Sequence, residues 1–234
     1  RGDVEGFFRE LEKMELLVFK QLDERLEAQS KRLARNYPFL MKQGVWLDSE
    51  KLTDADEVRE VLKHGTLTIG FIGLAECLKA LIGVHHGESA EAQELGLRIV
   101  RHIREAANAR SHITHLNYSV IATPAEGLAG RFVKIDRERF GNIEGITDRD
   151  YYTNSFHIPV YFKITAAKKI RLEAPYHALT NGGHITYVEL DGDTCKNPQA
   201  FENRSVIAFS LLSILTSIVS APSAPYFATT KRII

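Results

Sequence analysis

The feature that most restricts the fold is an alternation of strand-like and helix-like segments in the middle of the chain. Residues 67–74 are apolar on both alternating faces, which is typical of a strand buried on both sides. Two helical segments follow: residues 75–82, closed by Gly83, and a second helix capped by Ser89. A second strand is predicted at residues 118–122. This order predicts a βαβ arrangement with parallel strands, and hence an α/β fold.

A long amphipathic helix is predicted before this series, over residues 4–33. Apolar residues recur there at steps of three and four, so they form one stripe on the helix surface. The helix is predicted to end at Asn36-Tyr37-Pro38, because the residue before a proline disfavours helical backbone. A short charged helix is predicted at residues 54–63. The loop between the two helices carries apolar residues that are predicted to pack into the core, with a docking surface as the alternative: Phe39, Leu40, Val45 and Trp46.

The sequence after residue 150 is richer in strand-like segments. Strands are predicted at residues 155–164 and 184–190. The turn residues Asn181-Gly182-Gly183 introduce the second of them.

The end of the chain differs in kind from the rest. No charged residue lies between Ser205 and Thr230. We therefore divide the chain into one domain at residues 1–203 and an apolar tail at residues 204–234. The abrupt change in composition indicates sequence foreign to the fold, such as a frameshift or a fusion. A membrane helix is the alternative, but the apolar run is at the short limit for one.

Charge and cysteine content exclude several function classes. The chain has 30 Lys and Arg against 30 Asp and Glu, so no overall positive field attracts phosphates, and nucleic acid is not expected as a partner. Cys77 and Cys195 are far apart and show no metal-ligand spacing with the histidines, so no metal site is predicted within the chain. The sequence contains no phosphate-loop, zinc-protease, serine-hydrolase or dinucleotide-binding motif.

The most informative local sequence is the turn at residues 123–127, Thr-Pro-Ala-Glu-Gly. Thr123 suits a helix N-cap, Pro124 the first helical position and Glu126 the third, which together match a capping box. From local sequence alone, capping is the favoured role of Glu126. Cys77 lies near the start of a predicted helix and is interpreted as a packed residue rather than a reactive thiol.

Histidines are the other candidates for chemistry. His157, His177 and His184 lie in the strand-rich part and could line a pocket, although a structural role is more frequent for histidines beside strands. The pair His85-His86 is interpreted as part of a solvated loop. Asp191-Gly192-Asp193 lacks the remaining ligands of a calcium loop and is interpreted as a turn.

Four longer blocks carry a family resemblance. They read GTLTIGFIGLAECL, ATPAEGLAGRF, TDRDYYTNSFHIPV and EAPYHALTNGGHITY, and they occupy residues 65–78, 122–132, 147–160 and 173–187. In sequence and in order they closely resemble the large catalytic subunit of the class III, anaerobic ribonucleoside-triphosphate reductases. The resemblance covers about residues 1–202, so the apolar tail is not expected to belong to the family.

The resemblance implies a fold and an activity. The family builds a ten-stranded α/β barrel around a finger loop, and this chain corresponds to roughly its second half. Ribonucleoside triphosphates are reduced to deoxyribonucleoside triphosphates in the cytoplasm by glycyl and thiyl radical chemistry. A separate iron–sulfur, S-adenosylmethionine activase installs the glycyl radical, formate is the expected reductant, and the full-length enzyme is expected to be a homodimer. The family also holds a structural zinc in a four-cysteine module.

The departures from the family pattern are as informative as the matches. The thiyl cysteine motif, the zinc module and the radical glycine motif are not found in this sequence. The first residues, beginning with Arg1, are interpreted as a cut rather than a native start. We therefore expect the isolated chain to be inactive and to need no cofactor of its own. The alternatives are a non-catalytic fragment whose tail binds a partner or a membrane, and a fragment of another glycyl radical enzyme such as pyruvate formate-lyase.

The resemblance also suggests site residues. The family counterpart of Glu126 is the carboxylate beside the ribose, which can accept the 3′ hydroxyl proton as the radical forms. This changes the favoured role of Glu126 from capping to catalysis. Thr123, Ser155 and His157 are expected to bind the substrate, without an assigned chemical step.

Overall fold

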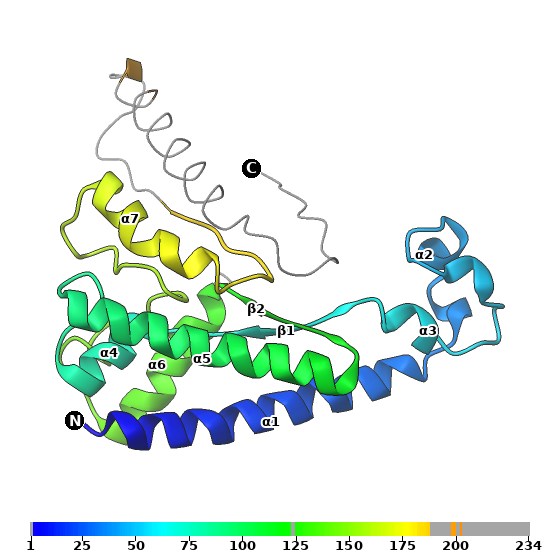
Figure 1. Cartoon of the computed structure of the whole chain (residues 1–234), viewed down its shortest axis with the longest axis horizontal. Helices are drawn as coiled ribbons and strands as arrows, with labels where there is room; N and C mark the ends of the chain where they lie inside the picture. Colours follow the sequence, from blue (N-terminus) through cyan, green and yellow to red (C-terminus); the bar gives the residue numbers. More distant parts are fainter. Residues whose placement is uncertain (1, 123–124, 188–197, 200–201, 203–234) are drawn as a thin grey trace. The chain divides into compact units, whose positions relative to one another are not determined.

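The computed structural model describes residues 2–122, 125–187, 198–199 and 202 (Figure 1). The chain divides into two compact units, residues 1–189 and 190–234, and the helices and strands labelled in Figure 1 belong to the first unit. Cys195, the turn at residues 191–193 and the apolar tail lie outside the described residues, so the predictions for them, and the boundary predicted at residue 203, stay predictions. Among the residues that the structure describes, none of the helices combines the length and apolarity that a membrane crossing requires.

A small parallel sheet lies in this mainly helical unit and confirms the predicted βαβ arrangement. β1 (Thr66–Gly70) pairs with β2 (Asn117–Ile121) in register along the whole length of both strands. The crossover between them contains α4 (Leu74–Ile82) and α5 (Ala90–Thr114). α5 packs against β2, as a crossover helix must if it is to cover one face of the sheet.

β1 is shorter and more exposed than the predicted strand at residues 67–74. Within it only Ile69 is fully buried, and both terminal residues are exposed. Gly73 has a φ of 79°, in the left-handed region that favours glycine, and the chain enters α4 directly after it. The prediction was therefore wrong for residues 71–74. Gly83, with a φ of 87°, ends α4 as predicted.

A third segment extends the sheet beyond β2. Gly183 forms a parallel bridge with Ile121, and the amide of Gly182 donates to the carbonyl of Val120 at 2.8 Å. The side chain of Asn181 accepts from the amide of Val120 at 3.0 Å. The amide of Ala122 also donates to the carbonyl of Gly183 at 3.0 Å. Residues 184–187 form no strand, so that part of the prediction for 184–190 was wrong, and the rest lies outside the described residues.

α1 (Val4–Ser30) is the predicted amphipathic helix. Asp3 caps it by accepting from the amide of Gly6 at 2.7 Å. Figure 1 shows α1 running beside α5, and the ion pair between Arg110 and Asp23 joins the two helices. The core lies between α1, α4, α5 and the sheet. Its largest buried members are Phe8, Phe19, Ile69, Leu74, Leu78, Ile99, Val100, Ile103, Tyr118, Val120, Phe156 and Tyr176.

A lobe of short helices, residues 31–65, connects α1 to β1. Its helices are η1 (Ala34–Asn36), α2 (Pro38–Lys42), η2 (Ser49–Lys51) and α3 (Arg59–Leu62). The charged helix predicted at residues 54–63 is thus only four residues long, because Asp56 accepts from both the amide and the hydroxyl of Thr53 and holds the preceding residues in a turn.

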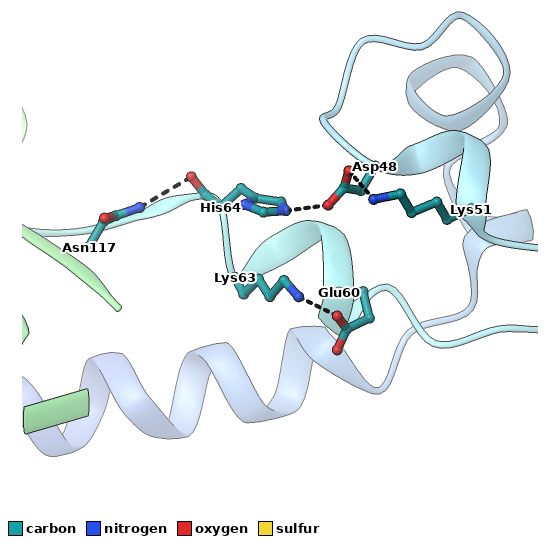
Figure 2. A network of polar contacts seen from close by, with 6 residues as sticks. All are labelled: Asp48, Lys51, Glu60, Lys63, His64 and Asn117. Carbon is teal, nitrogen blue, oxygen red and sulfur yellow. Dashed lines mark hydrogen bonds and ion pairs between the residues drawn. The ribbon is translucent and has the colours of Figure 1, made fainter. Parts of the chain in front are cut away.

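Polar contacts near the surface link the short helices and turns of this lobe to one another (Figure 2). Asp48 accepts from Lys51 at 2.7 Å and lies 2.9 Å from the ring of His64, and Lys63 pairs with Glu60. The hydrogen bond from Lys51 lowers the pKa of Asp48, and the hydrogen bond from His64 lowers it further by a smaller amount. These exposed pairs contribute little to stability.

The apolar loop of this lobe is exposed rather than packed. Phe39 is 69% exposed and Val45 is 53% exposed. The prediction that they pack into the core was therefore wrong. Tyr37 and Trp46 pack on each other instead, with ring centroids 5.5 Å apart.

The last two helices are α6 (Glu126–Phe140) and α7 (Ala166–His177). α7 was not predicted, and its N-cap is Thr165, which accepts from the amide of Lys168 at 3.3 Å. The strand predicted at residues 155–164 is wrong, because this segment is an irregular loop. Ser155 has a φ of 47° there, and Pro159 has no amide hydrogen to donate to a ladder.

The cap of α5 provides a test of the local structure. Ser89 accepts from the amide of Ala92 at 3.1 Å, as the N-cap prediction requires. Replacing Ser89 by Ala is expected to lower the free energy of unfolding by about 1 kcal/mol, measured by urea unfolding. Ser89→Asp keeps an acceptor at the N-cap and should stay near the wild type. An equal loss in both variants would show that the hydrogen bond is not what stabilises this end of α5.

Candidate active site

The carboxyl ends of β1 and β2 define the edge of the sheet at which the predicted site residues gather. The strands are parallel and in register, so Gly70 and Ile121 lie side by side where they end. Each strand is then followed by a turn into a helix, α4 after β1 and α6 after β2. In parallel α/β structures this edge is where ligands bind, because the turns are free to carry functional side chains.

The turn after β2 differs from the predicted capping box. α6 begins at Glu126, and its N-cap is Ala125, whose own side chain makes no cap hydrogen bond. Glu126 is therefore the first helical residue and not the third, and the capping box was wrong. Thr123, Pro124 and the side chain of Glu126 lie outside the described residues, so their predicted contact with the substrate stays a prediction.

One segment, residues 153–157, crosses both turns and holds them together. The amide of Gly73 donates to the carbonyl of Thr153 at 2.8 Å, on the β1 side. On the β2 side, the amide of Ala125 donates to the side chain of Asn154 at 3.2 Å. The same segment continues into Ser155 and His157. The start of α6 and these two predicted residues are thus brought to one place.

Ser155 and His157 are both buried in this segment. Ser155 is fully buried, and its positive φ of 47° is uncommon for a residue other than glycine, asparagine or aspartate. Such backbone strain is concentrated at functional sites, where the surrounding structure maintains it. The ring of His157 packs against that of Tyr187, with centroids 5.3 Å apart.

Glu76 on α4 supports the same segment and was not identified from the sequence. Its buried carboxylate accepts from the amide and the hydroxyl of Thr153, at 3.0 and 2.7 Å. Burial raises its pKa, and the bonds from Thr153 oppose that shift. An acidic residue in the first turn of a helix after a glycine was the available signal, but it does not distinguish a buried support from a solvated residue.

The other histidines form aromatic and polar contacts inside the unit. His85 and His86 are each 1% exposed, so the prediction of a solvated loop was wrong. The ring of His86 hydrogen-bonds the carbonyl of Phe156 at 2.7 Å, which fixes the loop before His157. His177 and His184 stack with centroids 3.8 Å apart. These contacts support a structural role for His85, His86, His177 and His184 better than they support a role in lining an open pocket.

Buried neutral histidines predict a pH dependence of stability. Burial lowers the pKa of His86 and of His177 to about 4, below the unfolded value of about 6.5. Between these pH values the unfolded chain binds more protons than the folded chain. The contribution of the two neutral histidines to the free energy of unfolding is therefore fully present above pH ~6.5 and is lost as the pH falls toward ~4. Urea unfolding across this window should show the loss, and His177→Gln should make it shallower. A flat profile would show that these rings protonate freely in the folded state.

The described part of the chain shows neither an acidified thiol nor a metal centre. Burial raises the pKa of Cys77 to about 12, which agrees with the prediction of a packed residue. Within the described ranges, no group of three or more histidine, cysteine or acidic side chains is placed to hold a metal ion. An open cavity of about 520 Å³ lies along α1 and includes Arg110 of α5, and none of the predicted site residues lines it.

Comparison with known proteins now identifies the family. The family model described as anaerobic ribonucleoside-triphosphate reductase matches residues 1–222. The curated reductases of that name from Salmonella typhimurium and Escherichia coli are 36% and 35% identical to this chain over 192 residues. That alignment covers 81% of this chain and 27% of either relative. The reductase of Enterobacteria phage T4 is 36% identical over 155 residues, 65% of this chain and 24% of its own length.

A solved structure shows the same fold. The anaerobic ribonucleotide reductase from Thermotoga maritima with glycerol in the active site matches with a TM-score of 0.50 and 19% identity, over 81% of this chain and 30% of that chain. The chain therefore shares the fold of an anaerobic ribonucleotide reductase. The chain belongs to the anaerobic ribonucleoside-triphosphate reductase family and spans about a quarter to a third of the length of its relatives. The family match extends to residue 222, beyond the predicted end of the resemblance near residue 202.

Proposed function

We propose that this chain forms part of the catalytic barrel of an anaerobic reductase that converts ribonucleoside triphosphates to deoxyribonucleoside triphosphates in the cytoplasm. It supplies about half of that barrel, including the carboxyl edge of β1 and β2 as a wall of the substrate site. Family membership supports the reaction, and the parallel strands support the barrel. The complete enzyme acts as a homodimer with a separate activase.

Each site residue has a proposed role. Glu126, at the start of α6, accepts the proton of the ribose 3′ hydroxyl, a step that requires hydrogen-bond reach of the substrate. Thr123, Ser155 and His157 hold the substrate beside it. The glycyl radical of the complete enzyme supplies the one-electron chemistry, and formate supplies the electrons for reduction.

The observation that carries this proposal is the hydrogen bond between Ala125 and Asn154. The amide of Ala125, directly before Glu126, donates to the side chain of Asn154 at 3.2 Å. Asn154 is followed at once by Ser155, and His157 lies two residues further on. Residues about thirty positions apart in the sequence are therefore held at one edge of the sheet, as a shared substrate would require.

The test is a chimaeric enzyme. Residues 1–202 of this chain replace the matching part of the Escherichia coli reductase, which is activated with its activase under anaerobic conditions. We expect deoxyribonucleotide formation that depends on formate. If the chimaera folds and forms its glycyl radical, yet makes no product, the chain is a non-catalytic relative and the proposal is wrong.

A further inference from the structure

The buried carboxylate of Glu173 on α7 has contacts that a structural role alone does not explain. Its side chain has no exposed surface. One oxygen, Oε1, accepts from the amide of Ile158 at 2.9 Å and lies 3.4 Å from Nδ1 of His157. A carboxylate is retained at such a place only when charge and hydrogen bonds compensate its loss of water.

Lys169 provides the compensating charge. It lies one turn earlier on α7, with its Nζ 3.5 Å from Oε1 of Glu173 and its side chain 11% exposed. Its ammonium group also donates to the carbonyl of Tyr187. Because Lys169 neutralises the carboxylate, the contact with His157 is not needed for charge balance and is available for another role.

The side chains of Glu173 and His157 each have a buried polar atom without a hydrogen bond. Within the described part of the chain, neither Oε2 of Glu173 nor Nδ1 of His157 has a partner. Nδ1 already lies 3.4 Å from Oε1 of the carboxylate, within the distance range of a hydrogen bond but without a hydrogen bond being formed. Hydrogen bonds at catalytic sites are often long before the substrate binds and shorten afterwards.

We propose that Glu173 is a positioning residue that accepts the Nδ1–H of His157 and thereby fixes its tautomer. The proton is then held on Nδ1, and the lone pair of Nε2 is left to accept a hydrogen bond from a hydroxyl group of the nucleotide. The rings of Phe156 and Tyr187, 5.2 and 5.3 Å from that of His157, restrict its rotation. This inference rests on the proposed function, in which His157 contacts the substrate.

The first experiment measures the tautomer directly in the full 234-residue chain. Nitrogen NMR at mildly alkaline pH reports which ring nitrogen carries the proton, and His157→Gln identifies the signals of His157. The test variant is Glu173→Gln combined with Lys169→Met, which removes both buried charges together so that neither is left uncompensated. Lys168→Met, an exposed neighbour on α7, is the control.

We expect the Nδ1–H tautomer in the wild type and in the control, and a shift toward Nε2–H in the double variant. The glutamine oxygen can still accept from the amide of Ile158, so the fold should persist. A neutral amide accepts the Nδ1–H of His157 more weakly than a carboxylate does, so it no longer holds the proton on that nitrogen. An Nε2–H tautomer in the wild type, or an unchanged Nδ1–H tautomer in the double variant, would overturn the inference. Neither result depends on the activity of the chain.

The second experiment separates this inference from the proposed function. In the chimaeric reductase, the double variant should lower kcat about tenfold or more with little change in KM, while its urea midpoint stays near that of the parent. If His157→Gln lowers turnover but the double variant does not, the positioning role of Glu173 is overturned. If His157→Gln leaves turnover unchanged, the substrate contact of His157 fails, whatever the NMR shows.

Discussion

Replacing Glu126 by Gln in the chimaeric reductase is expected to lower turnover about 10²-fold or more while substrate affinity persists. The amide is similar in shape to the carboxylate but cannot accept a proton, so only the general-base step is lost. Because Glu126 begins α6, loss of its charge near the helix N-terminus should change the free energy of unfolding by only about 0.3–1 kcal/mol.

The measurement is the initial rate of deoxyribonucleotide formation at equal glycyl radical content. Glu138→Gln is the matched control, because it makes the same change at an exposed position of the same helix. That control should keep the parent rate. Near-normal turnover of Glu126→Gln would remove Glu126 from the catalytic step and leave it as a residue of the helix terminus.

The largest loss of stability is expected from Phe156→Ala in the 234-residue chain. Phe156 is fully buried and stacks on Tyr176 of α7, with ring centroids 5.1 Å apart and planes at 9°. Truncating it leaves a cavity, and the expected cost is about 3–5 kcal/mol in the free energy of unfolding. Since Phe156 lies between Ser155 and His157, catalytic turnover in the chimaera should fall as well.

Urea unfolding followed by circular dichroism gives this free energy. The control is Phe39→Ala, because Phe39 is 69% exposed and its removal should cost no more than about 0.5 kcal/mol. A similar small change for both variants would mean that the loop at residues 155–158 is not anchored on α7 in solution.

The long helices α1 and α5, the helix α4 and the parallel strand pairing could be predicted from local signals. The caps at Ser89 and Gly83 depend on nearby residues, and both are found as predicted. α1 is the predicted helix, but its buried apolar residues are Phe8 and Phe19, which lie beside the predicted stripe. The strand predicted at residues 155–164 was wrong because a buried loop can have the same apolar pattern. In addition, Ser155 has a positive φ, which its residue type does not predict. The conformation of such a segment is determined by its tertiary contacts.

In the candidate site, too, some residues could be predicted from the sequence and others could not. The family resemblance pointed to Ser155 and His157, and the structure brings them beside the start of α6 through Asn154. Glu76 and Glu173 could not be found from the sequence, because their role depends on partners that are distant in the chain, Thr153 and His157 among them. Acidic residues on amphipathic helices are usually solvated, and only burial distinguishes these two.

The most direct test is a crystal structure of the chimaeric reductase with a ribonucleoside triphosphate bound. The central claim is that the edge formed by β1, β2 and residues 153–157 faces the ribose. We predict a carboxylate oxygen of Glu126 within about 2.6–3.2 Å of the 3′ oxygen, with Ser155 and His157 lining the same site. A ribose bound elsewhere, with Glu126 out of hydrogen-bond reach, would contradict it.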